Sequence, residues 1–84
     1  MSPDGDVARV TLYSRPGCHL CDAARTVVDE VCAELGESFV EISVDDDPDL
    51  RRRYGDEVPV TLVDGARHDF WRIDPDRLRT ALTR

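Results

Sequence analysis

The chain contains no long hydrophobic run. Its apolar stretches all fall short of the roughly 18 consecutive residues that a membrane-spanning helix needs. The first six residues are polar and acidic, which is unlike the basic and apolar start of a secretory signal. We therefore expect a cytoplasmic protein that binds no membrane.

Basic side chains are scarce relative to acidic ones. The 84 residues include 18 Asp and Glu against 11 Lys and Arg, which gives a formal net charge of −7. Nucleic acids and anionic membranes both attract cationic surfaces, so this balance argues against them as partners. We interpret the acidic excess as a contribution to solubility. The length suits one domain with a thin core, which we expect to be a monomer.

Cysteines are few, and their number is odd. There are three, and only Cys18 and Cys21 form a Cys-x-x-Cys motif. A structural zinc site usually takes four ligands from two such pairs, and His19, Cys32 and His68 do not complete a familiar spacing. No histidine follows Cys21, which excludes haem attachment through a CxxCH motif. The single motif, without an export signal, indicates redox or metal chemistry rather than a structural disulfide.

The apolar and turn patterns predict the element order β-α-β-α-β-β-α. We expect strands over 7–13, 39–44, 58–63 and 66–72, and helices over 19–35, over 48–54 and from Pro75 onward. Strands joined through helices should be parallel, and the turn at Asp64-Gly65 adds an antiparallel hairpin. An acidic residue before proline opens the two later helices, at Asp47-Pro48 and Asp74-Pro75. The domain covers 7–84, behind a flexible leader over 1–6.

The predicted helix over 19–35 carries the clearest pattern. Its apolar residues recur at spacings of three and four, and they are Leu20, Ala23, Ala24, Val27, Val28, Val31 and Leu35. Gly36 predicts the end of this helix. Cys32 lies next to Val31, so we expect it to be a small buried packing residue.

The sequence also predicts the exposure of three residues near the end of the chain. His68 is expected at the surface of the hairpin. Phe70 and Trp71 alternate, so one of them should face the core and the other should face solvent or a partner. An exposed Trp71 near the Cys-x-x-Cys motif would contact a partner.

The predicted position of Cys18, at the start of a helix, favours its thiolate, which is the form that attacks disulfides. Free N–H groups and the positive end of the helix dipole lie there. Arg15 adds a permanent positive charge nearby, and His19 adds another when it is protonated. Cys21 lies one turn along the helix, where it can attack a mixed disulfide formed at Cys18. We therefore assign Cys18 as the nucleophile and Cys21 as the resolving thiol.

The segment Leu12–Cys21 reads LYSRPGCHLC and resembles the active-site segment of glutaredoxins, which commonly reads Tyr-Ser-Lys-Pro-x-Cys-Pro-Tyr-Cys. Glu57-Val58-Pro59 resembles the Thr-Val-Pro of the same family. Three strings also resemble a group of short bacterial glutaredoxin-like proteins: Asp45-Asp46-Asp47-Pro48, Tyr54-Gly55 and Val58-Pro59-Val60. The resemblance runs from Val7 to the end. It implies an α/β, thioredoxin-like fold, with a four-stranded mixed sheet flanked by three helices.

The resemblance also implies a function and a set of site residues. A glutaredoxin-like thiol–disulfide oxidoreductase of cell redox homeostasis would use Cys18 and Cys21 as catalytic residues. The substrate-binding residues would be Arg15, His19, Leu20, Val58 and Pro59. The family proline is preceded by a cis bond, and the backbone beside it pairs with the substrate. Substrates would be protein disulfides or glutathione mixed disulfides, reduced with glutathione or a thioredoxin-type reductase and with no bound cofactor.

The chain departs from the family where glutathione binds. In place of a Gly-Gly-x-Asp segment it has Trp71-Arg72-Ile73-Asp74-Pro75-Asp76, whose bulk and carboxylates weaken the case for that anionic ligand. Arg15 replaces the lysine that meets the glycine carboxylate of glutathione, and one residue among Arg51, Arg52 and Arg53 is a further candidate. His19-Leu20 replaces Pro-Tyr, which leaves the redox potential open. Two alternatives remain: an iron–sulfur or metal carrier using Cys18, and a redox-inactive partner-binding module of the same fold.

Overall fold

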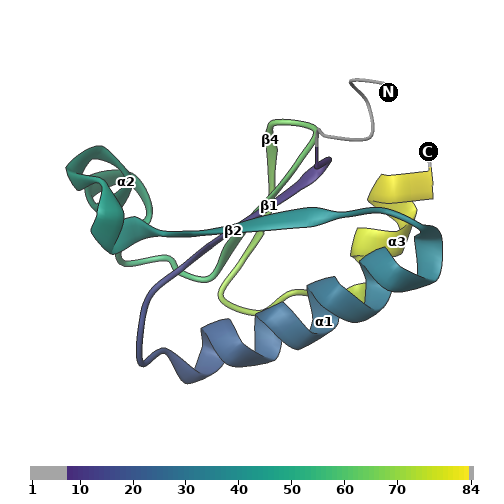
Figure 1. The fold of residues 1–84 in the computed structure, drawn as a ribbon, viewed down its shortest axis with the longest axis horizontal. Coiled ribbons are helices and arrows are strands. Elements are labelled where there is room, and N and C mark those ends of the chain that lie inside the picture. The colour runs from purple at the N-terminus through teal and green to yellow at the C-terminus, as the bar shows by residue number, and fades with distance from the viewer. Residues whose placement is uncertain (1–7, 84) are drawn as a thin grey trace.

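Four strands form a sheet that two helices cover on one face. The computed structural model describes residues 8–83. Its elements are β1 (Val10–Ser14), α1 (His19–Leu35), β2 (Phe39–Ser43), the 3-10 helix η2 (Val44–Asp46), α2 (Pro48–Tyr54), β3 (Val60–Val63), β4 (Ala66–Phe70) and α3 (Pro75–Thr83). Figure 1 shows α1 and α3 on the same side of the sheet and α2 beyond one end of it. Within the described residues, no helix is long and apolar enough to cross a membrane.

The order of the elements and the mixed sheet are as predicted. The strands lie in the order β2-β1-β3-β4, and β4 forms the expected antiparallel hairpin with β3. β1 and β2, which α1 connects, are parallel as predicted. The expectation that the strand after α2 would also be parallel is wrong, because β3 pairs antiparallel with β1.

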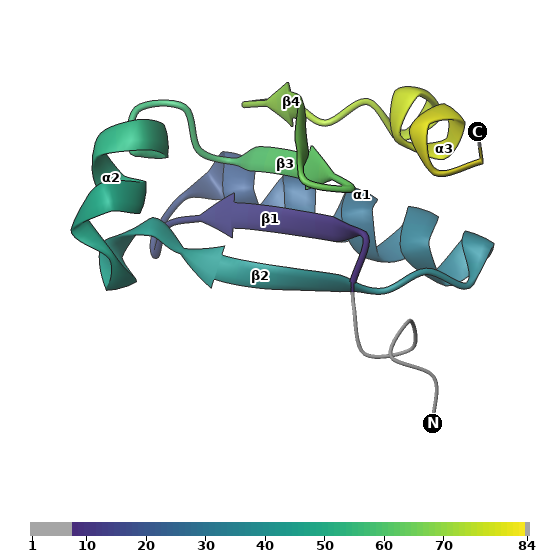
Figure 2. The same ribbon diagram turned by 90° about the horizontal axis from the view of Figure 1, so that it is seen from above.

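The shortness of α2 explains the direction of β3. A helix of seven residues rises by only about 10 Å. It cannot carry the chain back along a strand of five residues, which spans about 16 Å. Figure 2 shows α2 at the end of the sheet where β2 leaves and β3 begins. β3 therefore starts at that end and runs in the direction opposite to β2.

The strand ends differ slightly from the prediction. β1 includes Ser14, which the sequence pattern assigns to a break, because Ser14 pairs with Ser43 in the parallel ladder. β2 ends one residue early, at Ser43, whose hydroxyl accepts a hydrogen bond from the Asp45 N–H (3.2 Å) and opens η2. Val7 and the predicted leader over 1–6 lie outside the described residues.

α1 has the predicted bounds and the predicted end. Gly36 follows it in the left-handed region at φ 71°, and the backbone N–H groups of Gly36 and Glu37 donate to the Cys32 carbonyl. The buried residues of α1 are Cys21, Ala24, Val28, Val31 and Cys32. Leu20 and Ala23 belong to the predicted apolar stripe but stay exposed. The stripe is therefore wider than the face that the domain buries.

The core lies between the sheet and the helices α1 and α3. Buried side chains from both layers form one cluster: Val10, Leu12, Ala24, Val28, Val31, Cys32, Val63, Ile73, Leu78 and Leu82. Cys32 is 2% exposed, which confirms its predicted burial. The surface position predicted for His68 is wrong, because β4 turns this side chain toward α3 and leaves only 12% of it exposed. Among residues 8–83 its Nε2 atom has no hydrogen-bond partner.

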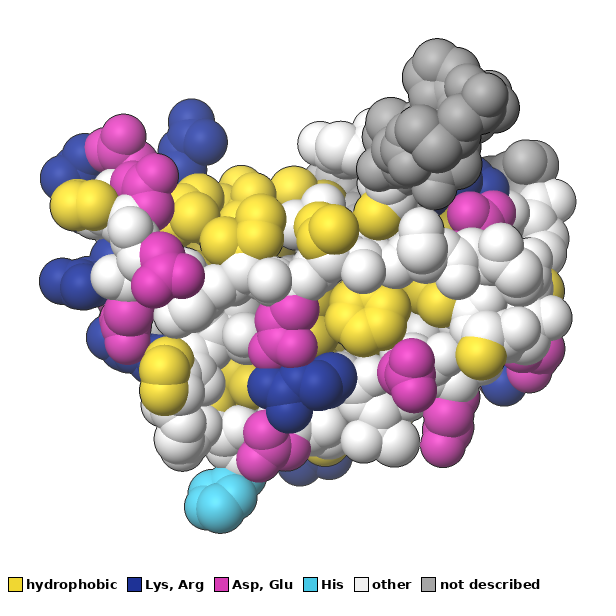
Figure 3. Space-filling model, viewed as in Figure 1, with side chains coloured by type: hydrophobic (Ala, Val, Ile, Leu, Met, Phe, Trp, Pro, Cys, Tyr) yellow, Lys and Arg dark blue, Asp and Glu magenta, His cyan; other side chains and the backbone are white. Residues whose placement is uncertain are grey.

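Charged side chains of both signs share the surface. Figure 3 shows Asp and Glu interleaved with Arg on the face drawn there. Of the arginines in residues 8–83, all but Arg53 and Arg72 form ion pairs with Asp or Glu. Most of the positive charge is therefore already neutralised by the chain itself.

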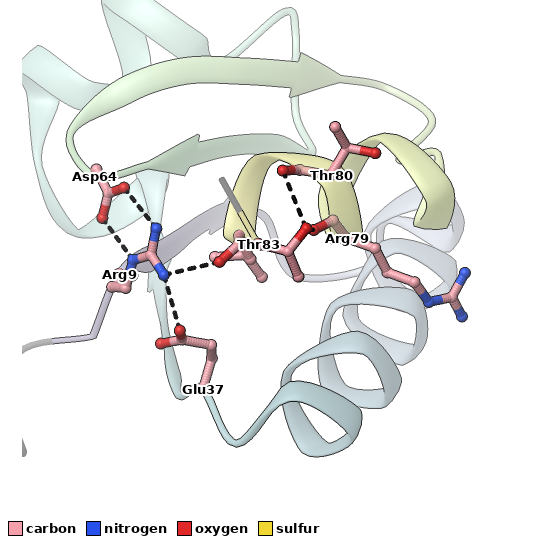
Figure 4. A network of polar contacts seen from close by, with 7 residues as sticks. Arg9, Glu37, Asp64, Arg79, Thr80 and Thr83 are labelled. Atoms are coloured by element: carbon pink, nitrogen blue, oxygen red, sulfur yellow. Dashed lines mark hydrogen bonds and ion pairs between the residues drawn. The ribbon is translucent and has the colours of Figure 1, made fainter.

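Arg9 holds four segments together at the end of the sheet where β1 begins (Figure 4). Its Nε and Nη2 atoms each donate to a carboxylate oxygen of Asp64 at 2.9 Å. Its Nη1 atom donates to the Glu37 carboxylate at 2.8 Å and to the Leu82 carbonyl at 3.0 Å. The guanidinium lowers the pKa of the Asp64 carboxyl. This network joins the residue before β1 to the connection after α1, the β3–β4 turn and α3.

Gly36→Ala should destabilise the domain through the backbone alone. An added Cβ meets no atom within 4 Å, but φ is 71°. An L-residue in this region costs about 1–2 kcal/mol, and each kcal/mol lowers the melting temperature of a domain this size by about 4–8 °C. Thermal unfolding followed by circular dichroism measures the loss. Gly36→Asn should lose less, since asparagine tolerates this conformation; equal losses would contradict the backbone explanation.

Candidate active site

Cys18 lies in the loop between β1 and α1 and is the N-cap residue of α1, as predicted. Its backbone is extended (φ −97°, ψ 113°), and its sulfur accepts a hydrogen bond from the Cys21 N–H at 3.1 Å. Its carbonyl accepts another from the Asp22 N–H at 3.2 Å. Gly17, at φ 75°, makes the turn that leads into this cap. The helix start thus directs an otherwise unpaired N–H group at the Cys18 sulfur.

Cys21 lies in the first turn of α1 and is inaccessible to solvent. Its side chain is 0% exposed, whereas Cys18 is half-buried, and both are free thiols. Burial, followed by the contact with the Cys18 sulfur, raises the pKa of the Cys21 thiol to about 12. The backbone N–H of Arg15 and the Arg25 guanidinium act in the opposite direction. One sulfur of the pair is therefore reachable, and the other is held protonated.

Arg15 lies beside an acidic side chain, whereas His19 is open to solvent. The Arg15 Nε atom lies 3.5 Å from the Asp45 carboxylate, which Arg51 also approaches at 3.5 Å. The guanidinium of Arg15 therefore forms an ion pair with Asp45. The backbone N–H of Arg15 donates a hydrogen bond to the Cys21 sulfur. His19 is the first residue of α1 and is exposed. Arg52 pairs with Asp49.

A polar network beside the dithiol was missed by sequence reasoning. Ser14, buried at the end of β1, donates its hydroxyl proton to Glu41 on β2 at 2.7 Å. Arg25 on α1 binds the same carboxylate through Nε at 2.6 Å and also reaches Asp22 at 2.9 Å. These contacts lower the pKa of the Glu41 carboxyl. They fix the first turns of α1 against the sheet, and only the Asp22–Arg25 spacing on one helix was visible in the sequence.

The Val58–Pro59 segment lies at the same end of the sheet as the dithiol. Val60, which follows it, pairs with Tyr13 of β1, just before the loop that carries Cys18. The bond between Val58 and Pro59 is cis, as the resemblance implies. β3 begins after this segment, at Val60, rather than at Val58 as predicted. The Pro59 carbonyl has a partner within the chain, because it accepts a hydrogen bond from the Trp71 N–H at 2.8 Å.

Trp71 directly follows β4 and is exposed. The expectation that one of Phe70 and Trp71 would face the core is wrong, since they are 43% and 51% exposed. Trp71 has φ 63°, a left-handed conformation that interrupts the strand alternation and ends β4 before Arg72. Its indole Nε1 donates to the Asp56 carbonyl at 3.3 Å, and its ring meets Phe70 edge-on. Two hydrogen bonds therefore hold Trp71 against the Pro59 loop.

Metal binding would rest on the dithiol itself. In the described part of the chain, no group of three or more His, Cys, Asp or Glu side chains is placed to hold a metal ion. Cys32 lies in the core, about three turns along α1 from Cys21. A carrier of a metal or cluster would therefore need ligands from outside this site.

The burial of the thiols predicts which cysteine is alkylated in the folded protein. We expect iodoacetamide to modify Cys18 first, because Cys21 and Cys32 are 0% and 2% exposed and burial raises the pKa of both thiols. Below its pKa a thiol gains thiolate as the pH rises, so reaction at Cys21 should grow about tenfold per pH unit. Mass spectrometry of digests locates the label. Denatured protein, with all three sites modified, is the control, and early labelling of Cys32 would contradict the assignment.

Comparison with known proteins identifies relatives along almost the whole chain. The family model described as glutaredoxin-like domain (DUF836) matches residues 9–83. An uncharacterized protein of Mycobacterium tuberculosis is 37% identical over 81 residues, which covers 90% of this chain and 84% of that protein. The X-ray structure of a structural genomics target protein from X. campestris is 38% identical, with a TM-score of 0.73, and the match covers 88% of this chain and 95% of that one.

A more distant structure shares the fold alone. The holo form of glutaredoxin C1 from Populus tremula x tremuloides is 18% identical, with a TM-score of 0.53, over 90% of this chain and 75% of that one. The thioredoxin-like fold and the glutaredoxin-like resemblance predicted from the sequence are confirmed by these matches. The chain belongs to the glutaredoxin-like domain (DUF836) family.

Proposed function

We propose that this protein is a cytoplasmic thiol–disulfide oxidoreductase of glutaredoxin-like type. The observation that carries the proposal is the unequal pair at the start of α1. The Cys18 sulfur is reachable and accepts an N–H hydrogen bond, whereas Cys21 is buried one turn later. Such a pair divides the two roles of a dithiol between its cysteines. The outer sulfur attacks the substrate disulfide, and the inner sulfur resolves the mixed disulfide that forms.

The reaction transfers two electrons to a protein disulfide or a glutathione mixed disulfide. The Cys18 thiolate attacks one substrate sulfur, which forms a mixed disulfide and releases the other sulfur as a thiolate. Cys21 then gives up its proton and attacks the Cys18 sulfur. The products are the Cys18–Cys21 disulfide and the reduced substrate, as one thiolate and one thiol. Two electrons from an external thiol, either two glutathione molecules or a dithiol reductase, restore the pair.

The region after β4 favours a dithiol reductase as the electron donor. Asp74 caps α3, because its Oδ1 atom accepts hydrogen bonds from the N–H groups of Asp76 (2.9 Å) and Arg77 (3.4 Å). These N–H groups are thus not free for a carboxylate of glutathione. Trp71 also fills the place of the small family residues with an indole ring.

Oxidation of the reduced chain with bis(2-hydroxyethyl) disulfide tests the proposal. We expect two of the three thiols to be lost and peptide mapping to show a Cys18–Cys21 disulfide, with Cys32 still reduced. Turnover is then compared with NADPH and thioredoxin reductase, and with NADPH, glutathione and glutathione reductase. A product linked through Cys32, or no turnover with either donor system, would overturn the proposal.

A further inference from the structure

A shallow groove begins inside the Cys-x-x-Cys motif. One wall is the exposed part of the apolar stripe of α1, where Leu20 is 42% exposed and Ala23 is also open to solvent. Val27, half-buried, continues this wall one turn further along. Apolar side chains left uncovered in a row beside a reactive site are typical of a binding surface rather than of a solvated helix face.

The segment after β4 forms the other wall. The cavity between the two walls has a volume of about 330 Å³ and is lined by Leu20, Ala23, Ala24, Val27, Trp71, Arg72 and Ile73. Ile73 is anchored in the core. Trp71 is held in its left-handed conformation by the hydrogen bonds to Pro59 and Asp56. The groove is therefore built from fixed parts, and a bulky aromatic in this backbone region needs such support.

The groove has one charged lining residue. Arg72 makes no ion pair within residues 8–83, in contrast to most arginines of the described chain. An unpaired guanidinium at the edge of an apolar groove attracts a carboxylate. The complementary ligand is an apolar side chain with an acidic group beside it.

We propose that this groove binds the protein substrate next to its reactive cysteine, and that the substrate class is protein disulfides flanked by an apolar and an acidic residue. The inference rests on the proposed function. Because Leu20 lies between Cys18 and Cys21, a substrate sulfur bonded to Cys18 places its neighbouring residues at the mouth of the groove. Glutathione fits poorly, since it has no apolar side chain for the groove. The bond between Cys18 and the substrate sulfur forms and breaks as described above.

Matched peptide disulfides test the groove. The reference is a cyclic peptide with one disulfide and with Leu and Asp beside one cysteine; its partners carry Ser for Leu or Asn for Asp. Burying a leucine side chain contributes enough to predict a kcat/KM roughly tenfold higher for the leucine peptide than for the serine peptide. Arg72→Gln should remove the smaller preference for Asp over Asn.

Two alanines of α1 supply a matched pair of variants. Ala23 and Ala33 are both exposed, but only Ala23 lines the groove. A neutral glutamine at 23 fills part of the groove without adding charge near the thiols. We expect Ala23→Gln to bring the Leu-to-Ser ratio close to one, and Ala33→Gln to keep both the ratio and the rate with bis(2-hydroxyethyl) disulfide.

The outcomes distinguish failure of the groove proposal from failure of the proposed oxidoreductase function. A chain that reduces bis(2-hydroxyethyl) disulfide but treats the leucine and serine peptides alike would overturn the groove and leave the dithiol function standing. Equal loss of the ratio in Ala23→Gln and Ala33→Gln would also overturn it. A chain that reduces none of the disulfides would overturn the proposed function, and the groove with it.

Discussion

Cys18→Ser should lose disulfide reduction completely, whereas Cys21→Ser should stop after the first step and accumulate a mixed disulfide. The reason is the geometry of the pair: Cys18 is the accessible sulfur and Cys21 is fully buried. A serine hydroxyl at position 18 cannot replace a thiolate as a nucleophile toward sulfur. In Cys21→Ser the attacking sulfur is intact, but no second thiol is in place to release the product.

Mass spectrometry of the intact protein distinguishes the two variants after reaction with a peptide disulfide. Cys21→Ser should gain the mass of one peptide chain at Cys18, and a reducing agent should remove it. Cys18→Ser should keep its original mass. Cys32→Ala is the matched control, because Cys32 lies in the core, and it should turn over as the unmodified chain does. A stable adduct on Cys18→Ser would reverse the roles of the two cysteines.

Local patterns in the sequence were enough to predict the helices and the position of the dithiol. The bounds of α1 follow from its apolar spacing and from Gly36, whose left-handed conformation ends the helix. Asp47 and Asp74 cap the two later helices as their position before proline indicates. Each of these signals depends on residues within one or two turns of chain, so no tertiary information was needed.

Apart from small shifts at the strand ends, the errors concern contacts between distant segments. The direction of β3 depends on the end of the sheet at which α2 delivers the chain. The burial of His68 depends on the packing of α3 against β4. The left-handed conformation of Trp71 is sustained by its bond to Pro59, and the Arg25–Glu41 pair joins a helix to a strand. No periodicity in the sequence encodes such pairs, because periodicity reports which face of an element is apolar and not what lies opposite.

Leu78→Ala should be the most destabilising single truncation in α3. Leu78 is 0% exposed and packs in the cluster that includes Val28 and Val31 of α1. Truncating a buried leucine costs about 2–5 kcal/mol, because apolar burial is lost and a cavity remains. Domains of this kind are stable by only about 5–15 kcal/mol. We therefore expect the melting temperature to fall by at least about 8 °C.

Leu20→Ala is the matched control for this truncation. The same atoms are removed from α1, but Leu20 is 42% exposed, so the free energy of unfolding should change by less than about 0.5 kcal/mol. Urea unfolding of both variants measures the difference. Because Ile73 of the groove packs in the same core cluster as Leu78, Leu78→Ala should lose the peptide preference of the groove at temperatures well below its unfolding transition. Similar stability of the two variants would show that the packing of α3 does not depend on Leu78. It would also contradict our inference that the core around Leu78 holds the groove wall in position.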